Sequence, residues 1–335
     1  MTGDGDICED DRDNPTLRCR VPTATPLTPV LDWLTRRFTY LTAAAWRDAI
    51  ANGRVRRNDA VAQLQDVVGG GDLVSVRTAP DELHVEILFE DERCVVVDKP
   101  AGSVVHAASA FTGRTFLRGL AARVGVAELH CVHRLDRDTS GALLLAKDAA
   151  TMADLQAQFA TRAVTKSYLA LTHGAWERDA VRVDAPLGPA AGSRVRTRRA
   201  VVAPGGRGAQ PASTDFAVLL RAAHHTLVLA TPHTGRTHQI RAHLEHLGHA
   251  LVGDKLYGRS DEAHLADLDA LRRGASPWAA STGCPHHLLH AAALTFTPPG
   301  AGGPRTVRAP LPEHFAAFLA QLRPDPGPPV QGRDS

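Results

Sequence analysis

Residues His130–Asp148 read HCVHRLDRDTSGALLLAKD, and the rest of the chain is best understood from this stretch. Its segment His133–Asp138 places one imidazole, two guanidiniums and two carboxylates within six residues. The Leu-rich run at 142–146 then predicts a buried strand bounded by turn residues. A short charged loop at the end of a rigid strand can hold the carboxylate of Asp136 in a fixed, partly desolvated place, and flanking arginines would keep it ionised.

These charges also have a purely structural interpretation, in which the two arginines pair with the two aspartates on a solvated turn. The order HRLDRDTSG followed by LLLAK favours a functional one. It resembles the catalytic motif of the RluA-type pseudouridine synthases, a family that isomerises uridine in ribosomal and transfer RNA. The resemblance implies that Asp136 is the nucleophile. We expect Arg134 and Arg137, on either side of it, to contact RNA.

Length and composition limit the class of protein. A chain of 335 residues can form one large domain and a small one, and 44% hydrophobic residues are enough for a core. No apolar run reaches membrane-spanning length and the Asp-rich start lacks the features of a secretion signal, so we expect a cytoplasmic protein without a membrane partner. Five scattered cysteines form no CxxC pair, which suits a reducing compartment. The net charge of +2 does not indicate nucleic acid by itself.

Changes in composition divide the chain into four parts. Residues 1–24 are polar and rich in Pro and Asp, which predicts a disordered tail. Residues 25–80 mix helical spacing with short β patterns and are expected to form a small RNA-binding domain. Residues 85–322 are the predicted catalytic domain, and the Pro- and Gly-rich residues 323–335 are a predicted loose tail. We expect the protein to be a monomer.

Within the small domain, residues 49–76 read AIANGRVRRNDAVAQLQDVVGGGDLVSV. This layout resembles the small RNA-binding domain shared with a small-subunit ribosomal protein. The resemblance implies that Arg54, Arg56 and Arg57 bind RNA phosphates, which fixes position without reading bases. The alternative is that they form a solvated basic face. Asp59 stands where many relatives have Gly, which weakens the expectation of a hairpin here.

A second family signature follows the linker. Residues 87–107, ILFEDERCVVVDKPAGSVVHA, predict two strands separated by a turn and then a Pro-Ala-Gly turn. Lys99 and His106 in this signature are candidate RNA-binding residues. For Lys99 the alternative is a structural pair with Asp98 or with a backbone carbonyl.

Residues 166–171, KSYLAL, alternate as a strand does. A single strand Tyr commonly packs in a core or across strands. The segment is, however, similar to the family's K-x-Y-x-A segment, whose Tyr stacks against the target uracil, and the resemblance assigns that role to Tyr168. A ring on a rigid strand is what a pocket for an extruded base requires.

Aliphatic residues between 240 and 247 recur at helical spacing and predict an amphipathic helix. Arg241 borders its apolar face and needs a carboxylate, because an unpaired buried guanidinium is costly. Glu245, one turn on, is the local candidate. The string TGRTHQIRAH resembles the family motif in which an Arg orients the nucleophile. We assign that role to Arg241, with Arg236 as second choice and as a candidate RNA contact.

Cys284 and the nearby His286, His287 and His290 have a spacing that matches no closed zinc site, and LLHAAALTFTPP instead resembles the family's closing strand. Pseudouridine formation breaks the bond between ribose and the uracil nitrogen, turns the base and rejoins it through carbon. No step is a redox step and no phosphate is activated, so we expect neither a metal nor another cofactor. Attack at the anomeric carbon and attack at carbon 6 of the base both stay open.

The predicted fold is α+β, with a long mixed, mostly antiparallel sheet flanked by helices and preceded by the small α/β module. The predicted activity is isomerisation of specific uridines in structured RNA. Large-subunit ribosomal RNA is the expected partner, and transfer RNA is the alternative. Two rival classes are a hydrolase that uses Asp138 as a second carboxylate, and a non-catalytic RNA-binding or ribosome-assembly protein.

Overall fold

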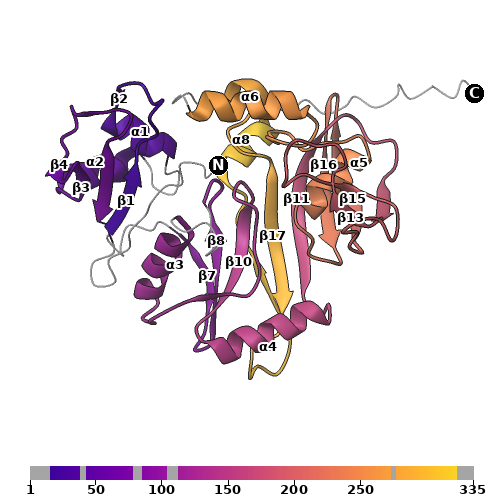
Figure 1. The fold of residues 1–335 in the computed structure, drawn as a ribbon. Coiled ribbons are helices and arrows are strands. Elements are labelled where there is room, and N and C mark those ends of the chain that lie inside the picture. The colour runs from indigo at the N-terminus through magenta and orange to yellow at the C-terminus, as the bar shows by residue number, and fades with distance from the viewer. Residues whose placement is uncertain (1–15, 38–42, 78–84, 104–111, 273–276, 323–335) are drawn as a thin grey trace, which may run out of the picture.

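The computed structural model describes residues 16–37, 43–77, 85–103, 112–272 and 277–322. Figure 1 shows a small N-terminal part beside a larger part built on one long sheet. The elements of the small part are β1 (Thr16–Arg20), β2 (Thr28–Pro29), α1 (Val30–Arg37), α2 (Ala43–Ala51), β3 (Val55–Arg57), β4 (Ala60–Val61), β5 (Val67–Val68) and β6 (Leu73–Arg77). The prediction of an α+β fold is confirmed.

The small part has its own core. Trp46 of α2 is fully buried there against the strands of a sheet with the order β1-β6-β3-β4. The prediction that residues 1–24 are a disordered tail is wrong from residue 16 onward. β1 pairs antiparallel with β6, and Cys19 and Val21 are buried in the same core. The strand therefore gains both ladder hydrogen bonds and apolar burial.

The hairpin between β3 and β4 forms even though its turn contains no glycine. Arg57 pairs with Ala60, so the connection is the two-residue turn Asn58-Asp59. Both turn residues have a positive φ, 49° at Asn58 and 65° at Asp59. This is the type I′ pattern that suits the twist of a hairpin, and Asn and Asp tolerate the left-handed region better than other side chains do.

The large part is organised on a sheet of ten described strands. Eight follow one path, in the order β12 (Ala180–Asp184), β15 (Ser213–Ala222), β16 (His225–Pro232), β11 (Thr165–His173), β17 (Leu289–Phe296), β10 (Ser140–Ala146), β8 (Cys94–Lys99) and β7 (Ile87–Glu90). The remaining two are β18 (Arg305–Arg308), which pairs with β17, and β9 (His130–Cys131), which pairs with β10. Among these strands only β10 and β17 run parallel, so the prediction of a mixed, mostly antiparallel sheet is confirmed.

Strand β10 is the Leu-rich run of the sequence, and every residue in it is buried. Leu143 and Leu145 belong to the same core cluster as residues of α3 (Thr112–Arg123), whereas Leu144 packs in the cluster that contains Leu155 of α4 (Ala149–Ala160). Alternate side chains of one strand thus fill cores on both faces of the sheet. This explains a continuous apolar run in a mostly antiparallel sheet.

Gly141, the second residue of β10, has a φ of 108°, and a Cβ there would lie 2.4 Å from the carbonyl oxygen of Ala291. Only glycine allows β17 to approach this closely. The start of β10 is therefore fixed against β17, and with it the end of the loop that carries Asp136.

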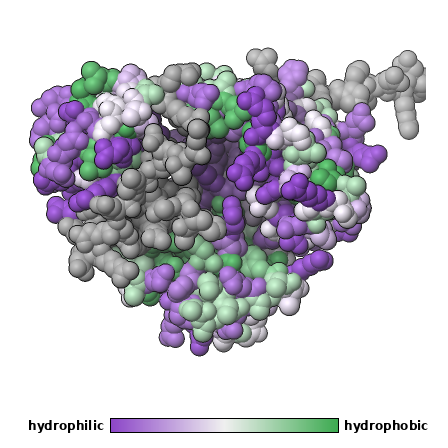
Figure 2. Space-filling model, viewed as in Figure 1, coloured by the Kyte–Doolittle hydropathy of each residue, from purple (hydrophilic) through white to green (hydrophobic). Residues whose placement is uncertain are grey.

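The other described elements are β13 (Leu187–Pro189), β14 (Arg199–Val201), α5 (Gln239–His246), α6 (Asp261–Arg272), α7 (Trp278–Thr282) and α8 (Glu313–Ala320). In Figure 1, α6 and α8 lie at the top of the view, and α5 and β13 lie on the right near β15 and β16. Within the described residues, no helix has the length and apolarity that a membrane crossing needs. Figure 2 shows one face of the molecule, where hydrophilic residues border a hollow near the middle and weakly hydrophobic residues gather at the bottom.

Candidate active site

Asp136 lies in the loop between β9 and β10. The loop is tied by its backbone, because the Thr139 N–H donates to the Asp136 carbonyl over 3.1 Å and the Gly102 N–H donates to the Arg137 carbonyl over 2.9 Å. The Asp136 side chain is 19% exposed, and it lines a cleft of about 340 Å³. A buried strand and a tied loop therefore present one carboxylate to a cavity that is large enough for a nucleoside.

Arg241, on the first turn of α5, is the partner of this carboxylate. Its Nη1 donates to Asp136 Oδ2 over 2.9 Å. Its Nε and Nη2 bind Asp254 over 2.7 and 2.8 Å, in the bidentate geometry that matches a guanidinium to a carboxylate. The expectation that Arg241 needs a carboxylate is confirmed, but Glu245 is not that carboxylate, because it binds Arg198 over 2.6 Å.

Asp254 has no exposed side-chain surface and was missed in the sequence. It follows Gly253, and its Oδ1 accepts the N–H groups of Leu256 and Tyr257 over 2.8 and 2.9 Å. This carboxylate therefore closes its own turn while it fixes the orientation of Arg241. The Tyr257 ring lies under the same guanidinium, with the Arg241 Cζ 4.9 Å from the ring centroid.

Asp136 remains ionised at neutral pH. Burial is the largest effect and acts to raise the pKa of Asp136, but the charge and the hydrogen bond of Arg241 are among the effects that together hold the pKa below its ordinary value. The same guanidinium lowers the pKa of Asp254 against the effect of burial, and the two carboxylates raise the pKa of Arg241. Arg241 thus shares its charge between two carboxylates. Asp254 accepts two hydrogen bonds from it, whereas Asp136 accepts one and faces the cleft.

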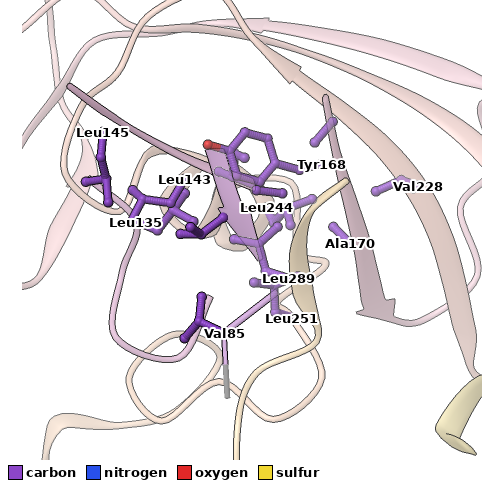
Figure 3. Packing of buried hydrophobic residues seen from close by; sticks show 14 of the residues in the cluster. Val85, Leu135, Leu143, Leu145, Tyr168, Ala170, Val228, Leu244, Leu251 and Leu289 are labelled. Atoms are coloured by element: carbon purple, nitrogen blue, oxygen red, sulfur yellow. The ribbon is translucent and has the colours of Figure 1, made fainter. Parts of the chain in front are cut away.

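Tyr168 forms part of the wall of the same cleft. It lies on β11 at an irregularity in the pairing with β17, and it is 9% exposed. Figure 3 shows its ring at the edge of the aliphatic cluster that includes Leu143, Leu244 and Leu289. Burial and the charge of Asp136 raise the pKa of the phenol, so Tyr168 stays protonated. The Tyr168 ring packs in the core and also lines the cleft. A packing role and a role in stacking on a base are therefore compatible.

A second set of contacts fixes the rest of the loop that carries Asp136 and the first residue of β10. Asp138 is buried and binds Lys255 over 2.6 Å. Three histidines near the start of β17 bind three successive residues of the loop: His286 Nδ1 to Asp138 at 3.1 Å, His287 Nε2 to Thr139 at 2.9 Å, and His290 Nδ1 to Ser140 at 2.9 Å. These are the histidines whose spacing raised the question of zinc, and they hold the loop instead.

The cleft also has a titratable structural residue, His133. Its Nε2 accepts the Leu144 N–H over 3.1 Å and its ring stacks on Phe159, with centroids 4.9 Å apart. Burial and, to a smaller extent, the charge of Lys166 lower the pKa of His133 to about 3. An unfolded histidine has a pKa near 6.5, so the unfolded state binds the extra proton between these two values. This contribution to stability is therefore complete above pH 6.5 and is lost as the pH falls towards 3.

We therefore expect His133→Gln to reduce the pH dependence of unfolding. Glutamine can accept the Leu144 N–H but does not titrate. The free energy of unfolding from urea titrations should fall less steeply between pH 6.5 and 4, by up to about 1.4 kcal/mol per pH unit. His246→Gln, an exposed position on α5, is the matched control and should keep the wild-type slope. An unchanged slope in His133→Gln would contradict the assignment of a neutral buried imidazole.

The predicted RNA-binding residues of the large part have different outcomes. The prediction for Lys99 is wrong: its side chain is fully buried, and its Nζ donates to the carbonyls of Pro100, Ser103 and Arg137 over 2.9 to 3.0 Å. His106 lies outside the described residues. The remaining predicted contacts are exposed: Arg134 and Arg236 line the cleft, and Arg137 follows Asp136 in the same loop.

In the small part, Arg54 directly precedes β3, and Arg56 lies within β3 and is exposed. Arg57 forms an ion pair with Asp72 over 2.8 Å, and this pair ties β3 to the turn before β6. Its charge is therefore partly neutralised inside the fold, unlike the charge of Arg56. RNA binding by all three stays a prediction.

The comparisons with known proteins agree with this geometry. The sequence model described as RNA pseudouridylate synthase matches residues 93–246. Ribosomal large subunit pseudouridine synthase D of Nitrosomonas europaea is 38% identical over 279 residues, which are 79% of this chain and 76% of the relative. The chain belongs to the RNA pseudouridylate synthase family. The predicted enzyme class, a pseudouridine synthase acting as an isomerase, is thereby confirmed.

Further relatives support the same assignment. Ribosomal large subunit pseudouridine synthase C of Escherichia coli K12 is 39% identical over 241 residues, or 71% of this synthase and 70% of the relative. Among solved structures, human RNA pseudouridylate synthase domain containing 4 matches with a TM-score of 0.55 and 30% identity, over 71% of this chain and 94% of that one. The predicted fold of the pseudouridine synthase is confirmed by this match.

Proposed function

We propose that this synthase isomerises uridine to pseudouridine in large-subunit ribosomal RNA, with Asp136 as the nucleophile. The observation that carries the proposal is the ion pair of Arg241 with Asp136 at a cleft whose wall contains Tyr168. The printed names of the relatives from Nitrosomonas europaea and Escherichia coli support the ribosomal substrate. We also propose that the enzyme works as a monomer in the cytoplasm.

In the proposed reaction the target uridine leaves its stack and enters the cleft, at a cost of a few kcal/mol. The ionised Asp136 attacks it and the bond between ribose and the uracil nitrogen breaks. The base turns while the enzyme holds both fragments, and its carbon 5 forms the new bond to the anomeric carbon. The bond to Asp136 breaks, the hydrogen of carbon 5 leaves to water as a proton, and the uracil nitrogen that was bound to ribose takes up a proton from water. Arg241 orients the nucleophile throughout. Tyr168, protonated because of its raised pKa, stacks on the uracil.

The position of Asp138 disfavours the hydrolase alternative. A hydrolase of this kind needs a second carboxylate facing the substrate. Asp138 binds Lys255 and His286 and is not among the residues that line the cleft. A carboxylate held in this way supports the loop and is not available to activate water.

We further propose that the small part binds RNA backbone through Arg54 and Arg56, with Arg134 and Arg236 at the cleft. Contacts of this kind make the affinity fall as salt rises. The slope of log K against log salt concentration is roughly 0.7 to 0.9 in magnitude for each phosphate that is neutralised. We therefore expect Arg54→Ala/Arg56→Ala to lower the slope by about 1 to 2, measured by fluorescence anisotropy with a labelled rRNA fragment. Arg178→Ala, exposed in the turn before β12, is the control. An unchanged slope in the double variant would reject this surface.

The target is tested by mapping pseudouridines in a strain that lacks the protein. We expect one or a few positions in large-subunit ribosomal RNA to lose the modification and to regain it with the wild-type gene but not with Asp136→Asn. Loss confined to transfer RNA would move the same chemistry to the alternative substrate. No change in either RNA would contradict the proposed function.

A further inference from the structure

His238 is a cleft residue to which the reaction outlined above gives no role. It precedes α5 at the N-cap position with a left-handed backbone, φ 57° and ψ 22°, and its side chain does not cap the helix. A non-glycine residue in this conformation is uncommon and points to a constraint on the side chain. The residue lies three positions before Arg241, close enough to Asp136 for their charges to interact.

The contacts of Tyr257 fix the tautomer of His238. The Tyr257 hydroxyl is 3.1 Å from His238 Nδ1, and it accepts the Arg199 N–H over 3.0 Å. The tyrosine is 1% exposed, and these are the hydrogen bonds of its hydroxyl within the described part of the chain. If His238 Nδ1 were the donor, the phenolic proton would be buried without an acceptor, at a cost of about 1–3 kcal/mol. Tyr257 is therefore the donor, and the proton of the neutral imidazole is on Nε2.

The other ring nitrogen is available to a ligand. Among the described residues, His238 Nε2 has no hydrogen-bond partner. This atom is not fully buried, and the residue lines the cleft, so a ligand in the cleft can reach it. Burial and the charges of Arg241 and Arg134 lower the pKa of His238, Asp136 and Asp254 act to raise it, and the result is a pKa of about 4. The ring thus presents an uncharged N–H beside the nucleophile.

We propose that His238 is a further substrate-binding residue, whose Nε2–H donates to a carbonyl oxygen of the extruded base. This inference rests on the proposed function. A neutral donor suits a neutral carbonyl, and it does not compete with Arg241 for the charge of Asp136. Phosphates are better matched by the exposed Arg134 and Arg236 at the same cleft. The bond orients the base before attack and retains it after the glycosidic bond has broken.

Two variants at His238 separate a donor from a packing residue. Glutamine places an amide N–H near the position of Nε2, whereas phenylalanine keeps a planar ring without a donor. The rate of pseudouridine formation in an rRNA fragment is measured under single-turnover conditions. We expect His238→Phe to lower this rate at least about tenfold and His238→Gln to stay within about threefold of the wild-type rate. RNA affinity should change less than about twofold in both. His246→Phe, exposed on the same helix, should react at the wild-type rate.

The tautomer is tested without catalysis or substitution. In wild-type protein with ¹⁵N-labelled histidine, NMR at pH 7 should show the proton of His238 on Nε2 and an unprotonated Nδ1. A proton on Nδ1, a wild-type rate in His238→Phe, or equal losses in the two variants would each overturn the inference. Wild-type protein that forms no pseudouridine would contradict the proposed function instead.

Discussion

Replacing Asp136 with Asn is expected to abolish pseudouridine formation, with a fall in the single-turnover rate of at least about 10⁴-fold, the scale of losing a covalent nucleophile. The amide has nearly the shape of the carboxylate and its oxygen can still accept the Arg241 N–H. It has no negative charge with which to attack the sugar or the base. The rate is measured by nucleoside analysis of an rRNA fragment with enzyme in excess.

The same variant should keep its fold and its RNA affinity, because the arginines proposed to bind phosphate are unchanged. Asp154→Asn is the matched control, since Asp154 is exposed on α4. It should react as wild type does. Conversion by Asp136→Asn at more than about a hundredth of the wild-type rate would contradict the role of Asp136 as nucleophile.

Arg241→Met is expected to remove both activity and much of the stability. The substitution leaves Asp254, which has no exposed side-chain surface, without its bidentate partner. Breaking a buried ion pair from one side costs about 3–5 kcal/mol, because a charge remains buried without compensation. The free energy of unfolding, measured by urea titration at pH 7, should fall by this amount.

A second substitution separates the two effects of Arg241. In Arg241→Met/Asp254→Asn no buried charge is left at position 254 and the amide oxygen can still accept the N–H groups of Leu256 and Tyr257, so we expect most of the lost stability to return. Activity should stay at the level of the single variant, because Asp136 still lacks its orienting donor. Recovery of activity together with stability would mean that Arg241 acts only through the fold.

The pairing of Asp136 with Arg241 could be predicted because each residue lies in a contiguous motif. HRLD, KSY and QIR carry Asp136, Tyr168 and Arg241, and the sheet brings all three to one cleft. The local pairing rule failed for Arg241. Glu245 is one turn away on the helix, but it faces Arg198, and the carboxylate that Arg241 needs comes from the turn at Asp254. Neighbours on a helix surface compete with groups that only the tertiary fold brings close.

For Lys99 a functional contact was predicted where the structure has a structural one. A lysine in a motif of an RNA enzyme suggested a phosphate contact, yet the structure uses its three donors to hold three backbone carbonyls of neighbouring turns. Burial lowers the pKa of Lys99 to about 7, and the three donated hydrogen bonds require its protonated form. The strand at residues 16–20 was missed because its alternation is short and polar, and its stability depends on the edge of β6.

Release of tritium from RNA that contains [5-³H]uridine tests the central claim most directly. Rejoining the base through carbon 5 displaces the hydrogen at that position into water, whereas the base itself stays in the chain. With wild-type enzyme and a large-subunit rRNA transcript, we predict tritium in water, one equivalent per modified site, and none in free uracil. Tritiated uracil released from the RNA, or no release from any RNA at all, would contradict the claim that Asp136 and Arg241 form the site of an isomerase.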